Sequence, residues 1–434
     1  MAASIADAET KRLLMADAWH AFVQVRPDPR GPSEGPLAGV RLVVKDNIQV
    51  QGMAYAAGQP LYAERQGQHT ASTVQRLRAA GARLLGMTRT DAGGFGVTTP
   101  EVDNPRLPGH IAGGSSGGGA AALAAGLADL ALCTDTGGSA RIPAACCGVF
   151  GYKPTHGLFP TDGVWPLAPV FDDVGLMANR LDLLEQAACV LGAPVAPEAN
   201  GPEANVRAHA ANIQTQATGI RVQATGGRPG ILRIGVDAQR AQAYAAGVRD
   251  DFLAMLQRLG MHEQLEIVAI SLPDRVQVHE AHGTLVLDQA RAIYAPVWPQ
   301  HKDGLARAAQ KALAVADTLA PDHVARMRGV LDRTRSAVER LFDRVDVVLT
   351  PTLMGPVPRV DQAKVCMGGR QTPVLVALTS EPCLANMTGC PAVVLPQPGD
   401  PPVLRSWQLM ARAGGDALLF AAARQLHSIV LDEE

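Results

Sequence analysis

The sequence predicts an α/β protein in which helices pack on a largely parallel or mixed sheet. In the first half of the 434-residue chain, short apolar segments alternate with segments of helical periodicity, which is the order typical of a layered α/β core. Strand-like apolar segments return after residue 229. Hydrophobic residues make up 47% of the chain and charged residues 18%, so there is enough apolar material for a large core.

The first half of the chain supplies six elements of this alternation. Each predicted strand is a mainly apolar run, β-branched in the first of them, and each predicted helix has apolar or alanine residues at helical spacing. In order, they are a helix (3–24), a strand and its exit (40–52, VRLVVKDNIQVQG), a helix (69–81), a strand (82–88), a glycine loop continuing as an Ala-rich helix (113–126), and a strand (127–135, LADLALCTD).

The second half repeats strand-like segments around one long helical block. Residues 196–229 are rich in Ala, Gln, Gly and Asn with weak periodicity, which predicts a surface excursion. Residues 279–344 predict helices, and four strands are predicted at 230–237, 265–272, 345–352 and 391–396. These strands carry no second chemical motif, so we expect them to complete the same sheet. The whole chain, residues 1–434, is predicted to be a single domain whose core motifs lie at about 37–180.

Composition argues against several classes of function. The net charge is −2, with no long run of like charge, so nothing favours a nucleic-acid or membrane partner. No apolar stretch reaches the length of a membrane span, and the acidic N-terminus does not resemble a signal peptide. Seven cysteines without a CxxC pair indicate reduced thiols and a cytoplasmic protein. Eleven histidines show no ligand spacing, so we expect neither a metal nor another cofactor.

The stretch TDTGGSARIPAACCG, residues 134–148, raises the question of what Ser139 does. Glycines let successive backbone N–H groups point at one spot, which is what an oxyanion hole requires. A serine on the same loop would place its hydroxyl beside those donors. The alternative is an ordinary glycine turn capped by a serine. Adjacent Cys146 and Cys147 are expected to be small core residues rather than a redox pair.

A nucleophilic serine needs a base at neutral pH. His110 and His156 are the nearest histidines in sequence, but neither lies in a recognisable motif, and no G-x-S-x-G is present. Lys45 ends an apolar strand, where loss of solvation would favour the neutral amine that can accept a proton. The alternative is that Lys45 is the surface end of that strand.

The chain resembles the amidase signature family in the order and spacing of three segments, VVKDNI, GGSSGGGAAALAAG and TDTGGSARIPAA. Three later segments are also similar to that family, namely GVFGYKPTHG, PLAPVFDDVG and LANMTGCPAVVLP. The resemblance extends from about Leu37 to the C-terminal region. It implies an α/β fold with a large mixed central sheet covered by helices on both faces.

The resemblance also implies a Ser-cisSer-Lys triad. Lys45 matches the family's base, Ser115 its bridging serine and Ser139 its nucleophile, and the Gly114–Ser115 peptide is expected to be cis. The implied reaction forms an acyl-enzyme at Ser139, with water as the second reactant. The oxyanion is expected on the backbone N–H groups of the loop that begins with Thr136, Gly137 and Gly138.

Other residues are expected to support this site. Arg141 matches the arginine of the family's GGSxR motif and is expected to order the loops. Asp135 is expected to accept backbone N–H bonds from the Ser139 loop. Ser116 is expected either to support the site or, slightly favoured, to cap the following helix. Trp165 and Phe159 are expected to line an acyl pocket or simply to pack in the core.

The chain departs from the family at several positions. The segment MTRTDAGGF (87–95) replaces a more usual KTN-containing loop, and PPVLRSWQLM (401–410) replaces a common GxPxGxQ. Ala112 stands where proline is frequent. These changes leave Lys45, Ser115 and Ser139 in place, and they leave the identity of the substrate open.

The expected activity is hydrolysis of a small-molecule carboxamide by a stand-alone enzyme, with a homodimer as one expected assembly. A carbamate or ester could be attacked by the same serine. A second hypothesis is the A subunit of glutamyl-tRNA(Gln) amidotransferase, which releases ammonia from glutamine within a heterotrimer. A third is a non-catalytic binding protein on the same fold, which would predict damage at Lys45, Ser115 or Ser139.

Overall fold

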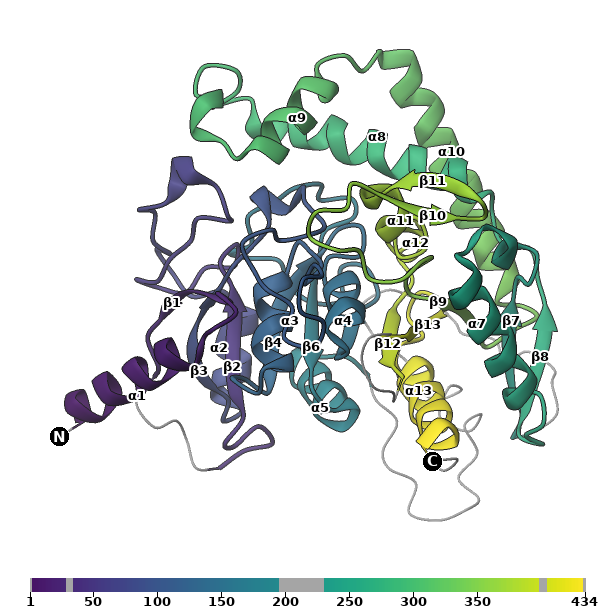
Figure 1. Ribbon diagram of the computed structural model, residues 1–434, viewed down its shortest axis with the longest axis horizontal. Helices are drawn as coiled ribbons and strands as arrows, with labels where there is room; N and C mark the ends of the chain where they lie inside the picture. Colours follow the sequence, from purple (N-terminus) through teal and green to yellow (C-terminus); the bar gives the residue numbers. More distant parts are fainter. Residues whose placement is uncertain (1, 29–33, 195–229, 398–403, 432–434) are drawn as a thin grey trace.

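The computed structural model describes residues 2–28, 34–194, 230–397 and 404–431, and within these ranges its centre is one mixed sheet of eleven strands (Figure 1). Strand β2 pairs in parallel with β3 and β4, and β7 pairs in parallel with β8 and β9, while the other neighbouring pairs are antiparallel. From one edge to the other, the strands are β1 (Phe22–Val25), β3 (Arg83–Thr88), β2 (Arg41–Lys45), β4 (Leu130–Asp135), β6 (Asp173–Ala178), β5 (Phe150–Lys153), β12 (Ala392–Pro396), β13 (Ser406–Ala411), β9 (Val347–Pro351), β7 (Leu232–Val236) and β8 (Leu265–Ala269).

Helices surround this sheet, and a short hairpin lies outside it. The hairpin pairs β10 (Lys364–Met367) with β11 (Arg370–Pro373). The helices are α1 (Ala2–Ala16), α2 (Ser72–Ala79), α3 (Gly117–Ala124), α4 (Arg141–Cys147), α5 (Leu181–Leu191), α7 (Ala246–Leu259), α8 (Arg275–Tyr294), α9 (Arg307–Ala316), α10 (Pro321–Leu341), α11 (Val374–Thr379), α12 (Cys383–Thr388) and α13 (Asp416–Leu431).

Two neighbouring residues of β5 show that helices cover both faces of the sheet. A Cβ on Gly151 would lie 2.7 Å from Cβ of Ala144 in α4, while the ring of Tyr152 lies 4.7 Å from that of Phe420 in α13. Successive residues of a strand point to opposite faces. Helices α4 and α13 therefore lie on opposite faces, and the expected α/β fold with a large mixed sheet is confirmed.

The predicted strands and the helical block are confirmed in outline. The strands expected at 230–237, 265–272, 345–352 and 391–396 are β7, β8, β9 and β12, and they join the same sheet as β2, β3 and β4. The helical block is three helices, α8 to α10. The excursion predicted at 196–229 lies outside the described residues.

The helix predicted over 3–24 is too long. Helix α1 ends at Ala16, and residues 22–25 form the edge strand β1. The Asp17 carboxylate accepts hydrogen bonds from the backbone N–H groups of Ala21 and Phe22, at 2.9 and 3.1 Å. This side chain offers the backbone an alternative to the helix, as aspartate does in turns, and Phe22 then pairs with Thr88 of β3.

Cys146 and Cys147 are buried in α4, as expected of small core residues, and both are free thiols. Burial raises the pKa of the Cys147 thiol to about 12. Among the described residues, no helix combines the length and the apolar character needed to cross a membrane.

Candidate active site

The candidate site lies where the parallel strands β2 and β4 end at the same edge of the sheet. Strand β2 ends at Lys45, and β4 ends at Asp135, from which the Ser139 loop begins. The glycine cluster that carries Ser115 leads into α3, which packs against both strands. Chain segments far apart in sequence are therefore brought together by the parallel pairing.

Lys45 is buried, with 1% of its surface exposed. Its Nζ donates hydrogen bonds to Ser115 Oγ at 2.7 Å and to Thr134 Oγ1 at 3.0 Å. Asn47 Nδ2 donates to the same Thr134 oxygen at 3.0 Å. Burial lowers the pKa of the Lys45 amine to about 8, because loss of water disfavours the charged form. Lys45 is thus not the surface end of its strand.

Ser115 is held by its backbone as well as by Lys45. The Gly114–Ser115 peptide is cis, as predicted, and the carbonyl oxygen of Ser115 accepts a hydrogen bond from the N–H of Asp91 at 2.9 Å. A Cβ on Gly114 would lie 2.7 Å from the carbonyl carbon of Val97, which is too close for any other residue. The glycine before Ser115 is therefore required by the approach of another backbone segment.

Ser116 occupies the N-cap position of α3 but makes no side-chain capping bond. Its hydroxyl lies 3.4 Å from the carbonyl oxygen of Thr134. The N–H of Gly117 is instead satisfied by Thr99 Oγ1 at 3.2 Å. The expected cap is thus supplied by a different residue, and Ser116 faces the end of β4.

Asp135 anchors the loop that carries Ser139. Its carboxylate accepts hydrogen bonds from the N–H groups of Gly138 and Ala140, at 2.8 and 3.2 Å. Arg141 donates to both carboxylate oxygens, at 2.9 and 3.0 Å. Burial opposes ionisation of Asp135, but the charge and hydrogen bonds of Arg141 and a hydrogen bond from Asn386 hold its pKa well below its usual range.

Three backbone donors of the loop remain available. Of the residues expected to form the oxyanion hole, Gly138 already donates its N–H to Asp135. Within the described part of the chain, the N–H groups of Thr136, Gly137 and Ser139 have no hydrogen-bond acceptor. These unsatisfied N–H groups on one glycine turn are the kind of donors an oxyanion needs.

His282 of α8 supports the same turn from outside the sheet. Its Nε2 lies 2.9 Å from the carbonyl oxygen of Thr136, and burial lowers its pKa to about 4. The ring is therefore neutral at pH 7 and donates through Nε2–H to that carbonyl. A Cβ on Gly137 would lie 2.5 Å from His282 Cε1, so only glycine fits beneath the ring.

Ser139 is 7% exposed, and its Oγ makes no hydrogen bond to another described residue. The contact expected between Ser115 and Ser139 is therefore not made in this structure. Because no other partner holds the Ser139 hydroxyl, rotation about its Cα–Cβ bond can turn it toward a partner. Hydrogen bonds between catalytic groups often tighten only when substrate binds.

Arg141 ties the Ser139 loop to the C-terminal part of the chain. It is fully buried, and its guanidinium donates to the carbonyl oxygen of Pro382 at 2.7 Å, to Gln408 Oε1 at 2.5 Å and to Asn386 Oδ1 at 2.7 Å. Pro382 and Asn386 lie at α12, and Gln408 lies on β13. The side chain thus orders the loop by joining it to two distant segments, α12 and β13.

Replacement of Arg141 by methionine is expected to lower the free energy of unfolding by about 3–5 kcal/mol, because Asp135 would be left buried without its ionic partner. Urea denaturation of both proteins measures this difference. The double variant Asp135→Asn/Arg141→Met is the control, and it should recover part of the loss. An Arg141→Met protein as stable as the wild type would contradict the assigned role.

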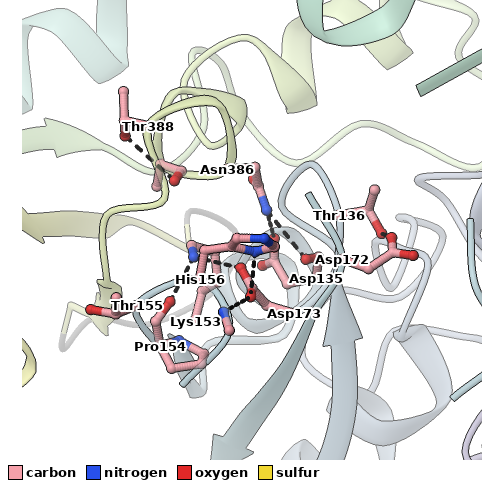
Figure 2. Close-up of polar contacts among 12 residues, drawn as sticks. Asp135, Thr136, Lys153, Pro154, Thr155, His156, Asp172, Asp173, Asn386 and Thr388 are labelled. Carbon is pink, nitrogen blue, oxygen red and sulfur yellow. Dashed lines mark hydrogen bonds and ion pairs between the residues drawn. The ribbon is translucent and has the colours of Figure 1, made fainter. Parts of the chain in front are cut away.

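A second buried cluster lies beside Asp135 (Figure 2). Lys153 Nζ donates to Asp173 Oδ2 at 2.7 Å, and His156 Nδ1 lies 2.9 Å from Asp173 Oδ1. Asp173 is the register partner of Asp135 in the β4–β6 pair. The next residue along, Asp172, accepts a hydrogen bond from Thr136 Oγ1 at 2.7 Å. The cluster therefore fixes the strand that supports the first residue of the Ser139 loop.

The two aromatic residues named from the sequence have different surroundings. Phe159 is 2% exposed, and its ring lies 6.1 Å from that of Tyr152, so it packs in the core. Trp165 is partly exposed, and its ring lies 5.1 Å from that of Tyr62. Its backbone N–H donates to the carbonyl oxygen of Asn47 at 2.8 Å, which places it close to Lys45 and its neighbours.

Sequence reasoning missed several residues that hold the site, namely Asn47, Thr134, His282, Asn386 and Gln408. Asn47 and Thr134 belong to the segments VVKDNI and TDTGGSARIPAA, so their place in those motifs was a usable signal. His282, Asn386 and Gln408 are more than a hundred residues from the Ser139 loop, and no local pattern links them to it. No group of three or more His, Cys, Asp or Glu in the described ranges could hold a metal ion.

Comparison with known proteins finds a family model and relatives that match the chain. A family model described as Amidase matches residues 14–420. The chain is 30% identical over 418 residues to the A subunit of glutamyl-tRNA(Gln) amidotransferase from Thermus thermophilus, a match covering 89% of this chain and 84% of that protein. The corresponding protein of Natronomonas pharaonis is 46% identical over 154 residues. That match covers 34% of this chain and 36% of the relative, so it spans little more than a third of either protein.

Similarity to a solved structure extends over nearly the full length. A crystal structure of an amidase matches the chain with a TM-score of 0.82 at 25% identity, covering 98% of this chain and 95% of that one. The architecture described above is therefore shared with that enzyme from end to end.

Proposed function

The chain belongs to the amidase family, and from that premise we propose that it hydrolyses a carboxamide C–N bond of a small molecule, with Ser139 as the nucleophile. One observation carries the proposal furthest: a buried lysine, Lys45, donates a 2.7 Å hydrogen bond to Ser115 beside a glycine turn with unsatisfied N–H groups. A buried amine with a lowered pKa next to a hydroxyl is suited to accept a proton from it.

In the proposed first half-reaction, neutral Lys45 takes the proton of Ser115 while Ser115 takes that of Ser139. The Ser139 Oγ then attacks the carbonyl carbon, and the N–H groups of Thr136, Gly137 and Ser139 stabilise the negative oxygen that forms. As the C–N bond breaks, the proton returns through Ser115 to the leaving nitrogen. The amine departs, and the acyl group remains on Ser139 as an ester.

In the second half-reaction, water attacks that ester and gives its proton to the same Ser115–Lys45 pair. The C–O bond to Ser139 breaks, the proton returns to Ser139, and a carboxylic acid leaves. This sequence requires Ser139 to turn its hydroxyl toward Ser115. Covalent catalysis replaces one difficult step by two easier acyl transfers, first to Ser139 and then to water.

The rate of amide hydrolysis is expected to rise with pH and to level off above about 8. The proposed base is the neutral form of Lys45, whose pKa is about 8, so kcat/KM should fall about tenfold for each pH unit below it. Measurement of kcat/KM for one substrate over a series of pH values tests this dependence. Rates that do not change across this range, or that fall as the pH rises through it, would contradict Lys45 as the base.

The activity itself is tested by a panel of neutral amides, anilides, carbamates, esters and glutamine. Release of ammonia or amine from an amide supports the proposal, and turnover of only esters or carbamates would redirect it to those substrates on the same serine. If the folded protein hydrolyses no member of the panel, that result contradicts the proposal of an amidase with broad specificity for small molecules.

A second candidate is the glutaminase component of a glutamyl-tRNA(Gln) amidotransferase. The Thermus thermophilus relative carries the name of that enzyme and matches 89% of this chain, which is the observation in its favour. The loop MTRTDAGGF and the segment PPVLRSWQLM depart from the family's usual patterns and argue for the stand-alone enzyme. Hydrolysis of glutamine but of no other amide in the panel would favour the amidotransferase component.

A further inference from the structure

Three aromatic rings surround the guanidinium of Arg65, and we call Tyr55, Tyr62 and Trp165 the aromatic cage. The Arg65 Cζ lies 4.3, 4.2 and 4.1 Å from the centres of these rings, respectively. The whole chain has only five Tyr and four Trp. With Tyr294 packed behind Trp165, four of these nine residues gather around one cation, which is a concentration that general core packing does not require.

The charge of Arg65 has no ionic partner among the described residues. Its Nε donates to the carbonyl oxygen of Tyr55 at 2.6 Å, and no described carboxylate lies within ion-pair distance. Its Nη2 is buried and has no acceptor. Burial lowers the pKa of Arg65, and the more distant Asp46 carboxylate offsets this only in part. A buried guanidinium donor without an acceptor is costly, so this position is suited to an anion supplied from outside the chain.

The aromatic cage borders the candidate active site through two chain segments. Trp165 N–H bonds to the carbonyl of Asn47, whose side chain shares Thr134 Oγ1 with Lys45. The segment that begins at Trp165 ends at Asp172, which accepts a hydrogen bond from Thr136 Oγ1 of the Ser139 loop. The segment from Trp165 to Asp172 is thus linked to Lys45 at one end and to the Ser139 loop at the other.

Residues outside the aromatic cage hold it in place. Tyr294 OH accepts hydrogen bonds from Trp165 Nε1 and Gln59 Nε2, each at 3.3 Å. A Cβ on Gly93 would lie 2.4 Å from that hydroxyl, so the altered loop MTRTDAGGF is what allows Tyr294 to approach. Helices α8 and α9 extend over this part of the molecule (Figure 1), and the N–H of Ala306 bonds to Gln59 Oε1 at 2.8 Å.

We propose that Arg65 binds a carboxylate of the substrate, so that the amides hydrolysed are monoamides of dicarboxylic acids or similar amides carrying an acidic group. This inference rests on the proposed function. The Tyr55 carbonyl oxygen accepts the Nε–H, so Nη1 and Nη2 are the donors that remain. Nη2 is buried in this structure, so a carboxylate meets Nη1 first and reaches Nη2 when the side chains that cover it move. The planar edge formed by these two nitrogens matches the two oxygens of a carboxylate, which arginine binds through two parallel hydrogen bonds.

The test compares matched substrates on wild type and Arg65→Gln. Monoamides of butanedioic, pentanedioic and hexanedioic acid are each paired with the neutral amide of the same chain length. For the best acidic amide, Arg65→Gln is expected to raise KM and lower kcat/KM by about 30-fold or more, while turnover of its neutral partner stays within about threefold. Arg26→Gln is the matched control, because Arg26 is an exposed arginine bonded to the nearby Gly52 carbonyl, and it should change neither.

Two results would overturn the inference while leaving the proposed function intact. One is wild-type enzyme that hydrolyses neutral amides as well as their acidic partners at every chain length. The other is Arg65→Gln enzyme that loses both members of a pair by the same factor. Arg65→Lys keeps the charge but not the paired donors, and it is expected to retain part of the preference.

A separate measurement applies if no amide is hydrolysed, which would be a failure of the proposed function. The Tm of the wild type and of Arg65→Gln is then measured with and without pentanedioate. A rise in the wild type that is absent in Arg65→Gln supports a carboxylate site at Arg65 alone. Equal shifts, or none, would overturn it.

Discussion

Replacing Ser139 with alanine is expected to lower kcat for amide hydrolysis by about 10⁴- to 10⁶-fold, because it removes the proposed nucleophile. Steady-state kinetics on the best amide of the panel measures this loss. Ser139 is nearly buried and makes no hydrogen bond to another described residue, so the substitution should leave the free energy of unfolding within about 1 kcal/mol of wild type.

Ser428→Ala is the matched control for this variant. Ser428 is an exposed serine on α13 whose hydroxyl bonds only its own helix, at the carbonyl oxygen of Gln425, and its removal should not change turnover. Ser139→Ala enzyme that keeps even a tenth of the wild-type rate would rule out Ser139 as the nucleophile.

Replacing Lys45 with methionine is expected to lower kcat/KM by about 10²- to 10⁴-fold, because it removes the proposed base. The remaining activity should lose the rising limb near pH 8 described above. Methionine is similar in length and needs no solvation, so the buried amine is lost without leaving an unpaired charge, and stability should be largely kept.

The other fully buried lysine, Lys153, provides the comparison for Lys45→Met. It forms a 2.7 Å ion pair with Asp173, so Lys153→Met should lower the free energy of unfolding by about 3–5 kcal/mol by leaving that buried carboxylate without its lysine, with only His156 and the Gly157 N–H beside it. Lys45→Met should instead lose activity and keep stability. The opposite pattern would contradict the assignment of these two lysines.

Most strands that could be predicted contain a run of apolar residues rich in Leu, Ile or Val, although β3, RLLGMT, and β7, LRIGV, also contain glycine. Strand β2 is RLVVK, and the run stops at Lys45, where the strand itself ends. Strands β5, FGYK, and β6, DVGLMA, were missed because FGYK has no Leu, Ile or Val and DVGLMA has only two, separated by glycine, although all their residues are buried. Lys153 and Asp173 can be buried there because they pair with each other, and that pairing is a tertiary contact that neither segment reveals alone.

The candidate site could be predicted to the extent that its residues lie in local motifs. Asp135, Ser139 and Arg141 fall within seven consecutive positions, and the structure places the aspartate and the arginine in an ion pair beneath the loop. The contact of Arg141 with Gln408 joins positions 267 residues apart. It follows from the antiparallel pairing of β12 with β5 and β13, which no short segment encodes.

The aromatic cage shows why the substrate could not be deduced from the sequence. Tyr55, Tyr62 and Arg65 lie in a loop without periodicity, and Trp165 is a hundred residues further on. The bond from Trp165 N–H to the Asn47 carbonyl is what brings them together. Only Trp165 was named from the sequence, and the arginine it covers was not.

The central claim is that an acyl group is transferred to Ser139, and peptide mass spectrometry after rapid acid quenching tests it most directly. Enzyme mixed with a hydrolysed amide or a slow ester of the same acid should carry the acyl mass on the peptide that contains Ser139, and not in Ser139→Ala. Hydroxylamine added during turnover should divert the product to the hydroxamate. An acyl mass on another residue, or turnover with no adduct and no hydroxamate, would contradict the account.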